Sequence, residues 1–119
     1  MDETQFKERT KKLALSTIRS VLALPKNTAA QVMGRQLLRS ATSIGANYRA
    51  ACRGKSKADL IAKLSIVEEE ADETAYWLEL LIESGLTSRE TLLPMLQETE
   101  EILAMTVASI KTLRRKGRP

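Results

Sequence analysis

Four arginines that share one side of an expected helix are the residues of this chain best suited to chemistry. They lie between about residues 33 and 53, a stretch without acidic residues, at Arg35, Arg39, Arg49 and Arg53. At about 100° per residue they fall within a sector of about 80°, and the apolar positions of the stretch point the opposite way. The pattern predicts a helix that buries one side and offers a cationic side, the arginine face, to an anionic partner.

Three explanations of the arginine face stay open on the sequence alone. Its guanidinium groups can contact phosphates, because arginine presents a planar fork that suits them and a cationic surface binds nucleic acid largely without sequence preference. They can instead pair with the acids of residues 56–84, in the same chain or in a neighbouring copy. That segment contains eight acidic residues and only two lysines. They can also simply be solvated. Aromatic residues are too scarce for base stacking to be the main mode of binding.

Catalytic chemistry has little support in the residue types present. The chain has no histidine, which removes the commonest general base and metal ligand. The acids of residues 68–73 are spread around their helix, as in a solvated or ion-paired face, and no phosphate loop, Ser-His-Asp set or Cys-x-x-Cys pair occurs. The single cysteine, Cys52, cannot form an internal disulfide, and we interpret it as packing. We expect a protein that is not an enzyme and holds no metal or cofactor.

Composition and periodicity predict an all-α fold. The chain has 119 residues, the length of one domain, and it favours helix formers over Gly, Pro and aromatic residues. Four amphipathic segments follow one another with short connectors, so an antiparallel up-down-up-down four-helix bundle is the simplest solution. We expect one domain over residues 1–119, with helices over about residues 4–24, 28–53, 57–84 and 88–113 and a basic tail over residues 114–119 that frays into solvent.

Local signals place the ends of these helices. Asn27 or Thr28 can cap the second helix, since either side chain can accept a backbone N–H bond. Residues 56–59 (SKAD) resemble a capping box for the third helix, with Asp in place of the usual Glu or Gln, and residues 87–90 (TSRE) form a full capping box for the fourth. Gly85 is the expected stop of the third helix.

Two positions make the course of the helices ambiguous. Gly45 and its β-branched neighbours lower helix propensity, and a break there is one interpretation. We prefer a continuous helix in which Gly45 permits the close approach of a neighbouring backbone, because the apolar spacing keeps its phase across it. Pro94 is expected to kink the first turns of the fourth helix or to delay the regular helix until about residue 94.

Apolar residues of the last two helices follow a four-three spacing, typical of a bundle core. The expected core positions are Leu60, Leu64, Val67, Ala71, Thr74, Leu78 and Leu81, then Leu92, Leu96, Thr99, Leu103, Thr106, Ile110 and Leu113. Ile66, Trp77 and Leu80 lie about 100° from the first of these seams. Either Trp77 covers a neighbouring helix at the bundle edge, or the three form a second apolar face that buries against another copy. We lean towards the second and take Ile66, Trp77 and Leu80 as a candidate oligomer interface.

Residues 37–53 (LLRSATSIGANYRAACR) resemble the signature of the four helix bundle protein family. This family is also known as the intervening-sequence proteins, because some members are encoded within insertions of large-subunit ribosomal RNA genes. The likeness continues through residues 56–60, 68–73 and 76–82 and covers about residues 6–116. The resemblance implies an antiparallel bundle that assembles into a ring, usually a homopentamer. The relatives are not known as enzymes.

A subset of similar proteins serves diversity-generating retroelements as an accessory protein, a pentameric basic barrel that binds nucleic acid and a reverse transcriptase. A reverse transcriptase is therefore an expected partner only if this chain belongs to that subset. Many relatives carry an acidic residue before the glycine aligned with Gly54, whereas residues 51–53 (ACR) contain none. This region is thus more basic than the family pattern.

These observations predict a non-enzymatic, oligomeric bundle that binds nucleic acid through backbone charge, with RNA or an RNA–protein assembly expected before DNA. The alternative is a structural or protein–protein interaction ring that binds no nucleic acid and whose arginines form salt bridges between helices or subunits. The start of the chain is acidic, and no apolar run approaches the roughly 18 residues that cross a bilayer, so we expect a cytoplasmic protein without a membrane partner.

Overall fold

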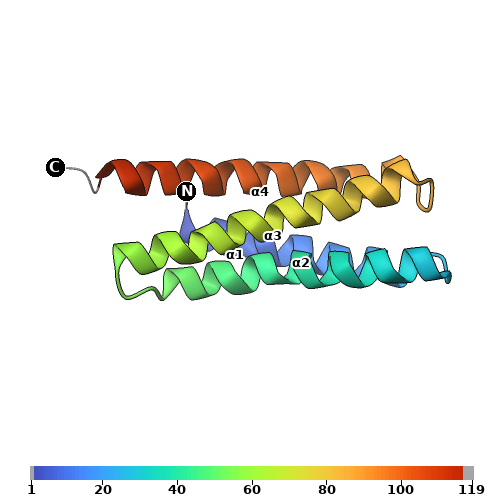
Figure 1. Cartoon of the computed structure of the whole chain (residues 1–119), viewed down its shortest axis with the longest axis horizontal. Coiled ribbons are helices and arrows are strands. Elements are labelled where there is room, and N and C mark those ends of the chain that lie inside the picture. Colours follow the sequence, from blue (N-terminus) through green and yellow to red (C-terminus); the bar gives the residue numbers. More distant parts are fainter. Residues whose placement is uncertain (1, 117–119) are drawn as a thin grey trace.

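Four long α-helices joined by three short connections make up the computed structural model, which describes residues 2–116. They are α1 (Glu3–Leu22), α2 (Thr28–Cys52), α3 (Lys57–Glu83) and α4 (Arg89–Lys116), and residues 2–116 contain no strand. Figure 1 shows the helices lying side by side along the long axis of the molecule, which measures 54 × 22 × 21 Å. Each helix packs against its successor, and α1 also contacts α4. The prediction of an all-helical fold with four helices is confirmed.

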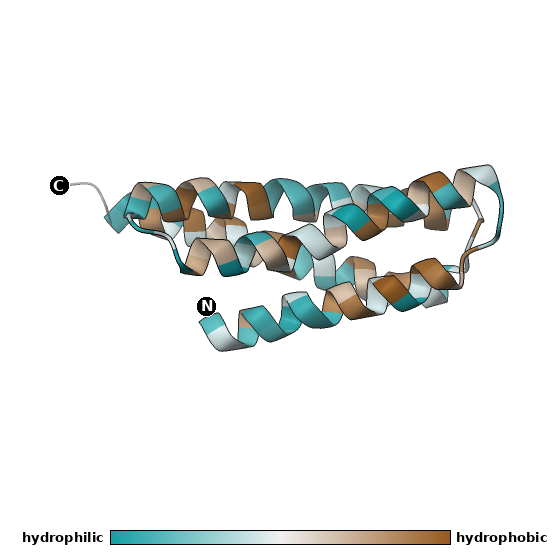
Figure 2. Cartoon of the chain, turned by 90° about the horizontal axis from the view of Figure 1, so that it is seen from below, coloured by the Kyte–Doolittle hydropathy of each residue, from teal (hydrophilic) through white to brown (hydrophobic). Residues whose placement is uncertain are grey.

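One hydrophobic core runs between the helices. In Figure 2, hydrophobic residues recur along each helix between hydrophilic ones. The largest fully buried side chains include Phe6, Leu37, Ile44, Leu78, Leu81, Leu92 and Ile102. Threonines also occupy core positions, at Thr10, Thr17, Thr74, Thr99 and Thr106, and each donates its hydroxyl to a carbonyl three or four residues earlier in its helix. The buried hydroxyls therefore have partners within their own helices, and the Thr74 hydroxyl also lies within hydrogen-bond distance of a second helix.

The core seam predicted for α3 is confirmed except at its first residue, which is only partly buried. The seam predicted for α4 is partly wrong. Met95 and Ile102 are buried, whereas Leu96 and Leu103 are only partly buried. Met95 lies beside α1, where the Ser20 hydroxyl is 3.3 Å from its sulfur. Leu92, Thr99, Thr106 and Ile110 are buried as predicted, and Leu113 is only partly buried. Only the alternate core positions of α4 are thus shifted by one residue, a difference that the four-three spacing alone does not resolve.

Side-chain caps begin α2 and α3 where the sequence predicts them. Asn27 Oδ1 accepts the N–H of Ala30 at 2.9 Å, which identifies Asn27 and not its neighbour as the cap of α2. Ser56 Oγ accepts the N–H of Asp59 at 3.0 Å. The Asp59 carboxylate accepts the N–H of Lys55 at 3.2 Å, so the capping box closes one residue earlier than its usual form.

The start of α4 differs from the prediction in two ways. Ser88, and not Thr87, supplies the cap, because Ser88 Oγ accepts the N–H of Thr91 at 3.3 Å and lies 2.6 Å from the hydroxyl of that residue. The helix begins at Arg89 and continues through Pro94, so the expected delay does not occur. Pro94 removes one backbone hydrogen bond in the second turn, and the long, packed helix tolerates that loss.

The far end of α4 extends beyond the predicted limit. Residues 114–116 are helical instead of frayed, consistent with basic side chains stabilising the negative end of the helix dipole. The rest of the expected basic tail, residues 117–119, lies outside the described residues.

Two glycines confirm their predicted roles. α2 is continuous through Gly45, where an added Cβ would lie 3.2 Å from Thr10 Oγ1 and 3.7 Å from the carbonyl carbon of Thr10. The backbone of α1 therefore approaches α2 closely at this point. Gly85 follows α3 with a φ of 78°, a conformation that suits glycine and ends the helix.

Arg9 joins α1 to α4, the two contacting helices that touch each other least. Its Nε lies 2.9 Å from Glu98 Oε2 and its Nη2 lies 2.6 Å from Glu98 Oε1, a two-pronged ion pair. Nη1 also lies 3.1 Å from the Met105 sulfur. The hydrogen bonds that Arg9 donates to the Glu98 carboxylate raise the pKa of Arg9 above its usual range, although burial opposes the rise. This contact fixes the level of α1 relative to α4.

Candidate nucleic-acid interface

The helix α2 has an apolar side that is buried in the core and an opposite, exposed side that carries the arginine face. Leu37, Ala41, Ile44 and Tyr48 are buried on the core side. The Tyr48 ring lies edge-on to Phe6 of α1, with ring centroids 4.4 Å apart. This burial fixes the rotation of α2 about its axis. The opposite side of the helix must therefore face solvent.

All four arginines of the arginine face are exposed on this outer side of α2. They form two pairs spaced by one helical turn, Arg35 with Arg39 and Arg49 with Arg53. No acidic residue occurs anywhere in α2. The structure therefore places Arg35, Arg39 and Arg49 on one continuous helix and Arg53 at its C-cap, one residue past the last helical residue, without a compensating charge from that helix.

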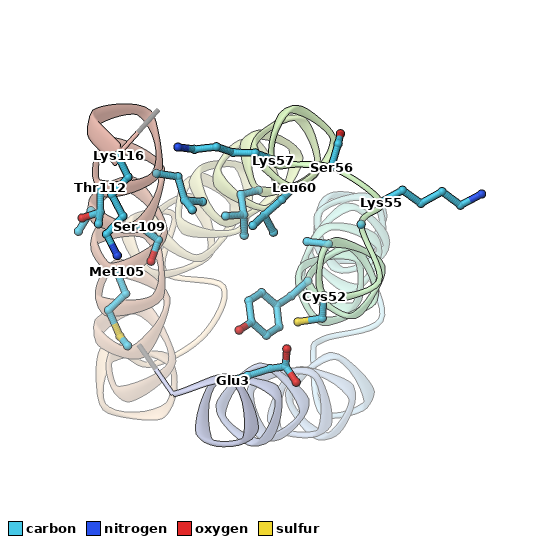
Figure 3. Close-up of a pocket in the computed structure, with 16 residues that line it drawn as sticks. Glu3, Cys52, Lys55, Ser56, Lys57, Leu60, Met105, Ser109, Thr112 and Lys116 are labelled. Carbon is cyan, nitrogen blue, oxygen red and sulfur yellow. The ribbon is translucent and has the colours of Figure 1, made fainter. Parts of the chain in front are cut away.

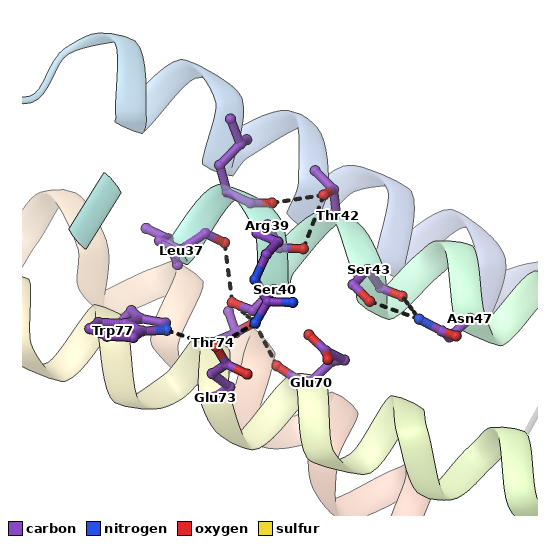
Figure 4. Close-up of polar contacts among 11 residues, drawn as sticks. Leu37, Arg39, Ser40, Thr42, Ser43, Asn47, Glu70, Glu73, Thr74 and Trp77 are labelled. Atoms are coloured by element: carbon purple, nitrogen blue, oxygen red, sulfur yellow. Dashed lines mark hydrogen bonds and ion pairs between the residues drawn. The ribbon is translucent and has the colours of Figure 1, made fainter. Parts of the chain in front are cut away.

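Arg39 differs from the other three because it forms an ion pair with α3. Its Nη2 lies 2.8 Å from Glu73 Oε1, and the indole N–H of Trp77 donates to the same oxygen at 3.3 Å. Figure 4 shows Arg39 reaching from α2 towards these two residues. Of the three explanations of the arginine face, Arg39 thus follows the second: it pairs with the acidic helix α3 of the same chain.

Arg35, Arg49 and Arg53 have no ion-pair partner within residues 2–116. All three are exposed, Arg35 in the first half of α2, Arg49 in its last turn and Arg53 at its C-cap. An exposed guanidinium without an internal partner keeps all five N–H donors for an external acceptor. These three residues are the part of the arginine face that can contact a phosphate at no cost to the fold.

A polar seam between α2 and α3 lies behind the arginine face and was not predicted from the sequence. Thr74 donates its hydroxyl to Ser40 Oγ at 2.9 Å, which links the two helices inside the core. Asn47 Nδ2 donates to the carbonyl and the hydroxyl of Ser43, at 2.9 and 2.7 Å. Figure 4 shows these groups along the α2–α3 contact. The small polar residues within residues 37–53 were the sequence feature that could have indicated this polar contact between the helices.

Glu70, on the α3 side of this seam, carries a buried oxygen, Oε2, that is not satisfied within the described part of the chain. Burial, and next the carboxylate of Glu73, raise the pKa of Glu70, whereas Arg39 opposes the rise.

The candidate oligomer interface on α3 is partly exposed. Ile66 is 41% exposed, while Trp77 and Leu80 are partly buried, with Trp77 packed against the core. Tyr76, which the sequence interpretation left out, is 54% exposed and lies edge-on to Trp77 with ring centroids 5.3 Å apart. Trp77 thus covers the bundle edge, and Ile66 and Tyr76 offer apolar surface beside it.

Residues 2–116 offer neither a metal cluster nor a membrane span. This part of the chain contains no group of three or more His, Cys, Asp or Glu side chains that could hold a metal ion. None of its helices is both long enough and apolar enough to cross a membrane.

A small all-helical protein with one cationic helix face is the class that this geometry defines. The model of the 23S rRNA-intervening sequence protein family matches residues 2–108, and the chain belongs to this family. A solved structure of a protein with unknown function from the S23 ribosomal protein family of Bacteroides thetaiotaomicron VPI-5482 is similar, with a TM-score of 0.85 and 38% identity over 93% of this chain and 99% of that chain. No curated protein matches the chain. The family resemblance seen in residues 37–53 is confirmed.

Proposed function

We propose that the protein binds nucleic acid, RNA before DNA, through the arginine face of α2. The observation that carries the proposal is the exposure of Arg35 and Arg49 on one acid-free helix and of Arg53 at its C-cap, without ion-pair partners among the described residues. A continuous helix spaces these three charges over about 27 Å. Because such contacts are made to phosphates, binding has little sequence preference and weakens steeply with salt.

The family name and the charge distribution favour RNA as the first ligand to test. The name associates the family with the intervening sequence of 23S rRNA. The scarcity of aromatic residues, 3% of the chain, favours contacts to the phosphate backbone over stacking on bases. The protein would act by binding, without a catalytic step, in the cytoplasm.

Self-association completes the proposal. Each copy is an up-down-up-down antiparallel bundle, and copies meet through the α3 face that includes Ile66, Tyr76, Trp77 and Leu80. A ring of five, the number that the family resemblance implies, repeats the arginine face around its axis. Several weak phosphate contacts then act together through multivalency.

A salt titration with a fluorescently labelled RNA hairpin tests the nucleic-acid proposal. We expect about micromolar affinity at low salt, with the logarithm of the binding constant falling linearly as the logarithm of salt rises. The variant Arg35→Ala/Arg49→Ala/Arg53→Ala should bind at least tenfold more weakly at low salt, and its salt slope should be smaller by about 2 to 3. Fluorescence anisotropy measures both quantities.

A matched control removes the same charge from α1. The variant Lys11→Ala/Lys12→Ala/Arg19→Ala loses three exposed cations outside the arginine face, and its affinity should stay within about threefold of the unmodified chain. Equal losses in the two variants would show that net charge, and not the arginine face, governs binding. No binding at low salt would refute the proposal outright.

The Arg39–Glu73 pair favours the alternative in which arginines hold helices or subunits together. Analytical ultracentrifugation separates the two functions. Under the alternative, the triple arginine variant dissociates the oligomer and no RNA binding exists to lose. Under the proposal, the triple arginine variant keeps the oligomer, whereas Ile66→Glu on α3 dissociates it.

A further inference from the structure

A cavity of about 880 Å³ opens at the end of the bundle where α2 ends and α3 begins. All four helices contribute to its wall, from the first turn of α1 to the last three turns of α4. Figure 3 looks into it along the helices. Its size lies within the range of pockets that enclose small ligands, and helical bundles often hold ligands between their helices.

The cavity arises because α1 stops short of the other helices at this end. Arg9 of α1 and Met105 of α4 are in contact, so they lie at the same height along the bundle axis. From that height towards the cavity, α1 has only residues 3–8, whereas α4 continues through residues 106–116. α4 therefore extends about 7 Å beyond the start of α1. The inner sides of α3 and α4 have no fourth helix to cover them over this distance.

The wall of the cavity is mostly apolar. Leu60 and Leu64 from α3, Met105 and Leu113 from α4, and the ring of Tyr48 line it. Three of these side chains, Leu60, Met105 and Leu113, are only partly buried, so they keep apolar surface towards the cavity. Flexible methionine and leucine side chains adapt well to a ligand without a rigid shape.

Charged groups lie at the mouth in an unequal arrangement. In Figure 3 the Lys57 side chain extends from α3 towards α4, and Lys116 lies on α4 at the same mouth. Glu3, on the α1 side, turns its carboxylate to the cavity beside Cys52. Lys55 points away from the cavity. The α3–α4 side of the mouth is thus cationic, and the wall behind it is mostly apolar, with Ser109 and Thr112 of α4 as polar members.

We infer that this cavity binds a single-headed anionic amphiphile, a medium- or long-chain fatty acid, with its alkyl chain against Leu60, Leu64, Met105 and Leu113 and its carboxylate beside Lys57 and Lys116. A polyphosphate ligand suits the site less well, because the two cations stand at the rim and the deeper wall offers leucine and methionine. The inference is independent of nucleic-acid binding, since the arginine face lies on the outside of α2.

Isothermal titration calorimetry of the full chain with laurate, below its micelle concentration, tests the inference. We expect a dissociation constant between about 1 and 100 µM. Dodecyltrimethylammonium, which carries a chain of the same length and the opposite charge, should bind at least tenfold more weakly. No detectable binding up to about 1 mM laurate, or equal affinity for the two amphiphiles, would overturn the inference.

Matched variants locate the binding. Lys57→Glu/Lys116→Glu should weaken laurate binding tenfold or more, whereas Lys55→Glu should leave it within twofold. Ala108→Trp places an indole in the cavity and should abolish binding, while Ala104→Trp, one turn away on α4 and outside the cavity wall, should not. Circular dichroism checks that each variant is folded. Unchanged affinity in the folded Ala108→Trp variant would overturn the inference.

Cys52 gives a second readout, since it is the only cysteine of the chain and lines the cavity. Saturating laurate should slow its reaction with N-ethylmaleimide at least fivefold, and dodecyltrimethylammonium at the same concentration should not. If Cys52 is instead protected without laurate and becomes reactive on dilution of the protein, a second copy occupies the cavity. That result would also overturn the inference.

Discussion

The Glu70 carboxylate faces α2 with one oxygen buried and without a hydrogen-bond partner in the described part of the chain. Its pKa is raised, first by burial and next by Glu73. A raised pKa in the folded state means that this site favours folding below the ordinary pKa of glutamate. The benefit is lost as the pH rises through the raised value, because the folded protein must then hold a charge in a poorly solvated place.

Glu70→Gln should therefore stabilise the protein at pH 7 and not at pH 4. The expected gain at pH 7 is about 1 kcal/mol, since the glutamine carries no buried charge, and the gain should shrink towards zero as Glu70 becomes protonated in the parent chain. Urea unfolding followed by circular dichroism at both pH values measures it. Glu69→Gln, at an exposed position of the same turn, should stay within about 0.5 kcal/mol at both pH values. A gain of equal size at pH 4 would contradict the assignment to ionisation.

The exposure of the arginines was predictable from the sequence, but their partners were not. The phase of the apolar residues around Ile44 and Tyr48 set which side of α2 faces outwards. Which arginine meets an acid depends on the register between α2 and α3, and the buried Ser40–Thr74 hydrogen bond takes part in fixing that register. No short-range pattern encodes it. Arg39 and Glu73 are paired for this reason, although Arg35 looks equivalent to Arg39 in the sequence.

Gly45 illustrates how one position controls the spacing of two helices. An added Cβ would already lie 3.2 to 3.4 Å from side-chain atoms of Thr10, and the Thr10 backbone stands just behind. Gly45→Leu should force α1 and α2 apart and destabilise the protein by about 2 kcal/mol or more. Ala46→Leu, at the exposed neighbouring position, should change stability by less than about 0.5 kcal/mol. Thermal or urea unfolding of both variants checks the difference, and similar values for the two would contradict close helix contact at Gly45.

Helix limits were predicted best where a single residue decides them. Asn27 and Gly85 each end or begin a helix for a reason that is local to one side chain or one φ angle. The cap of α4 was misassigned because Thr87 and Ser88 can both accept the bond, and only the path of the chain selects Ser88. The delay expected from Pro94 does not occur because tertiary packing offsets a local helix penalty. Local chemistry thus gives the existence of a helix more securely than its first turn.

The whole molecule is least firmly joined between α1 and α4. α1 has 20 residues and the other helices have 25 to 28, and α1 touches α4 less than any other contacting pair of helices touch each other. The same mismatch leaves the end cavity open. α2 and α3, which have the most extensive contact, form the centre of the bundle. Regions with few buried contacts open at a lower free energy than the global unfolding of the protein.

Arg9→Ala should therefore weaken the molecule at one place before it weakens the rest. Glu98, whose side chain is 30% exposed in the parent chain, would lose its two-pronged partner, and the expected destabilisation is about 1 kcal/mol. In native-state hydrogen exchange, amides of α1 should lose protection first, followed by the last turns of α4, while α2 and α3 keep theirs. Lys12→Ala, which removes an exposed cation from the same helix, should leave the exchange pattern unchanged. An equal loss of protection in all four helices of the Arg9 variant would show that the bundle opens as one unit, and that the Arg9 contact with Glu98 and Met105 does not hold α1 separately.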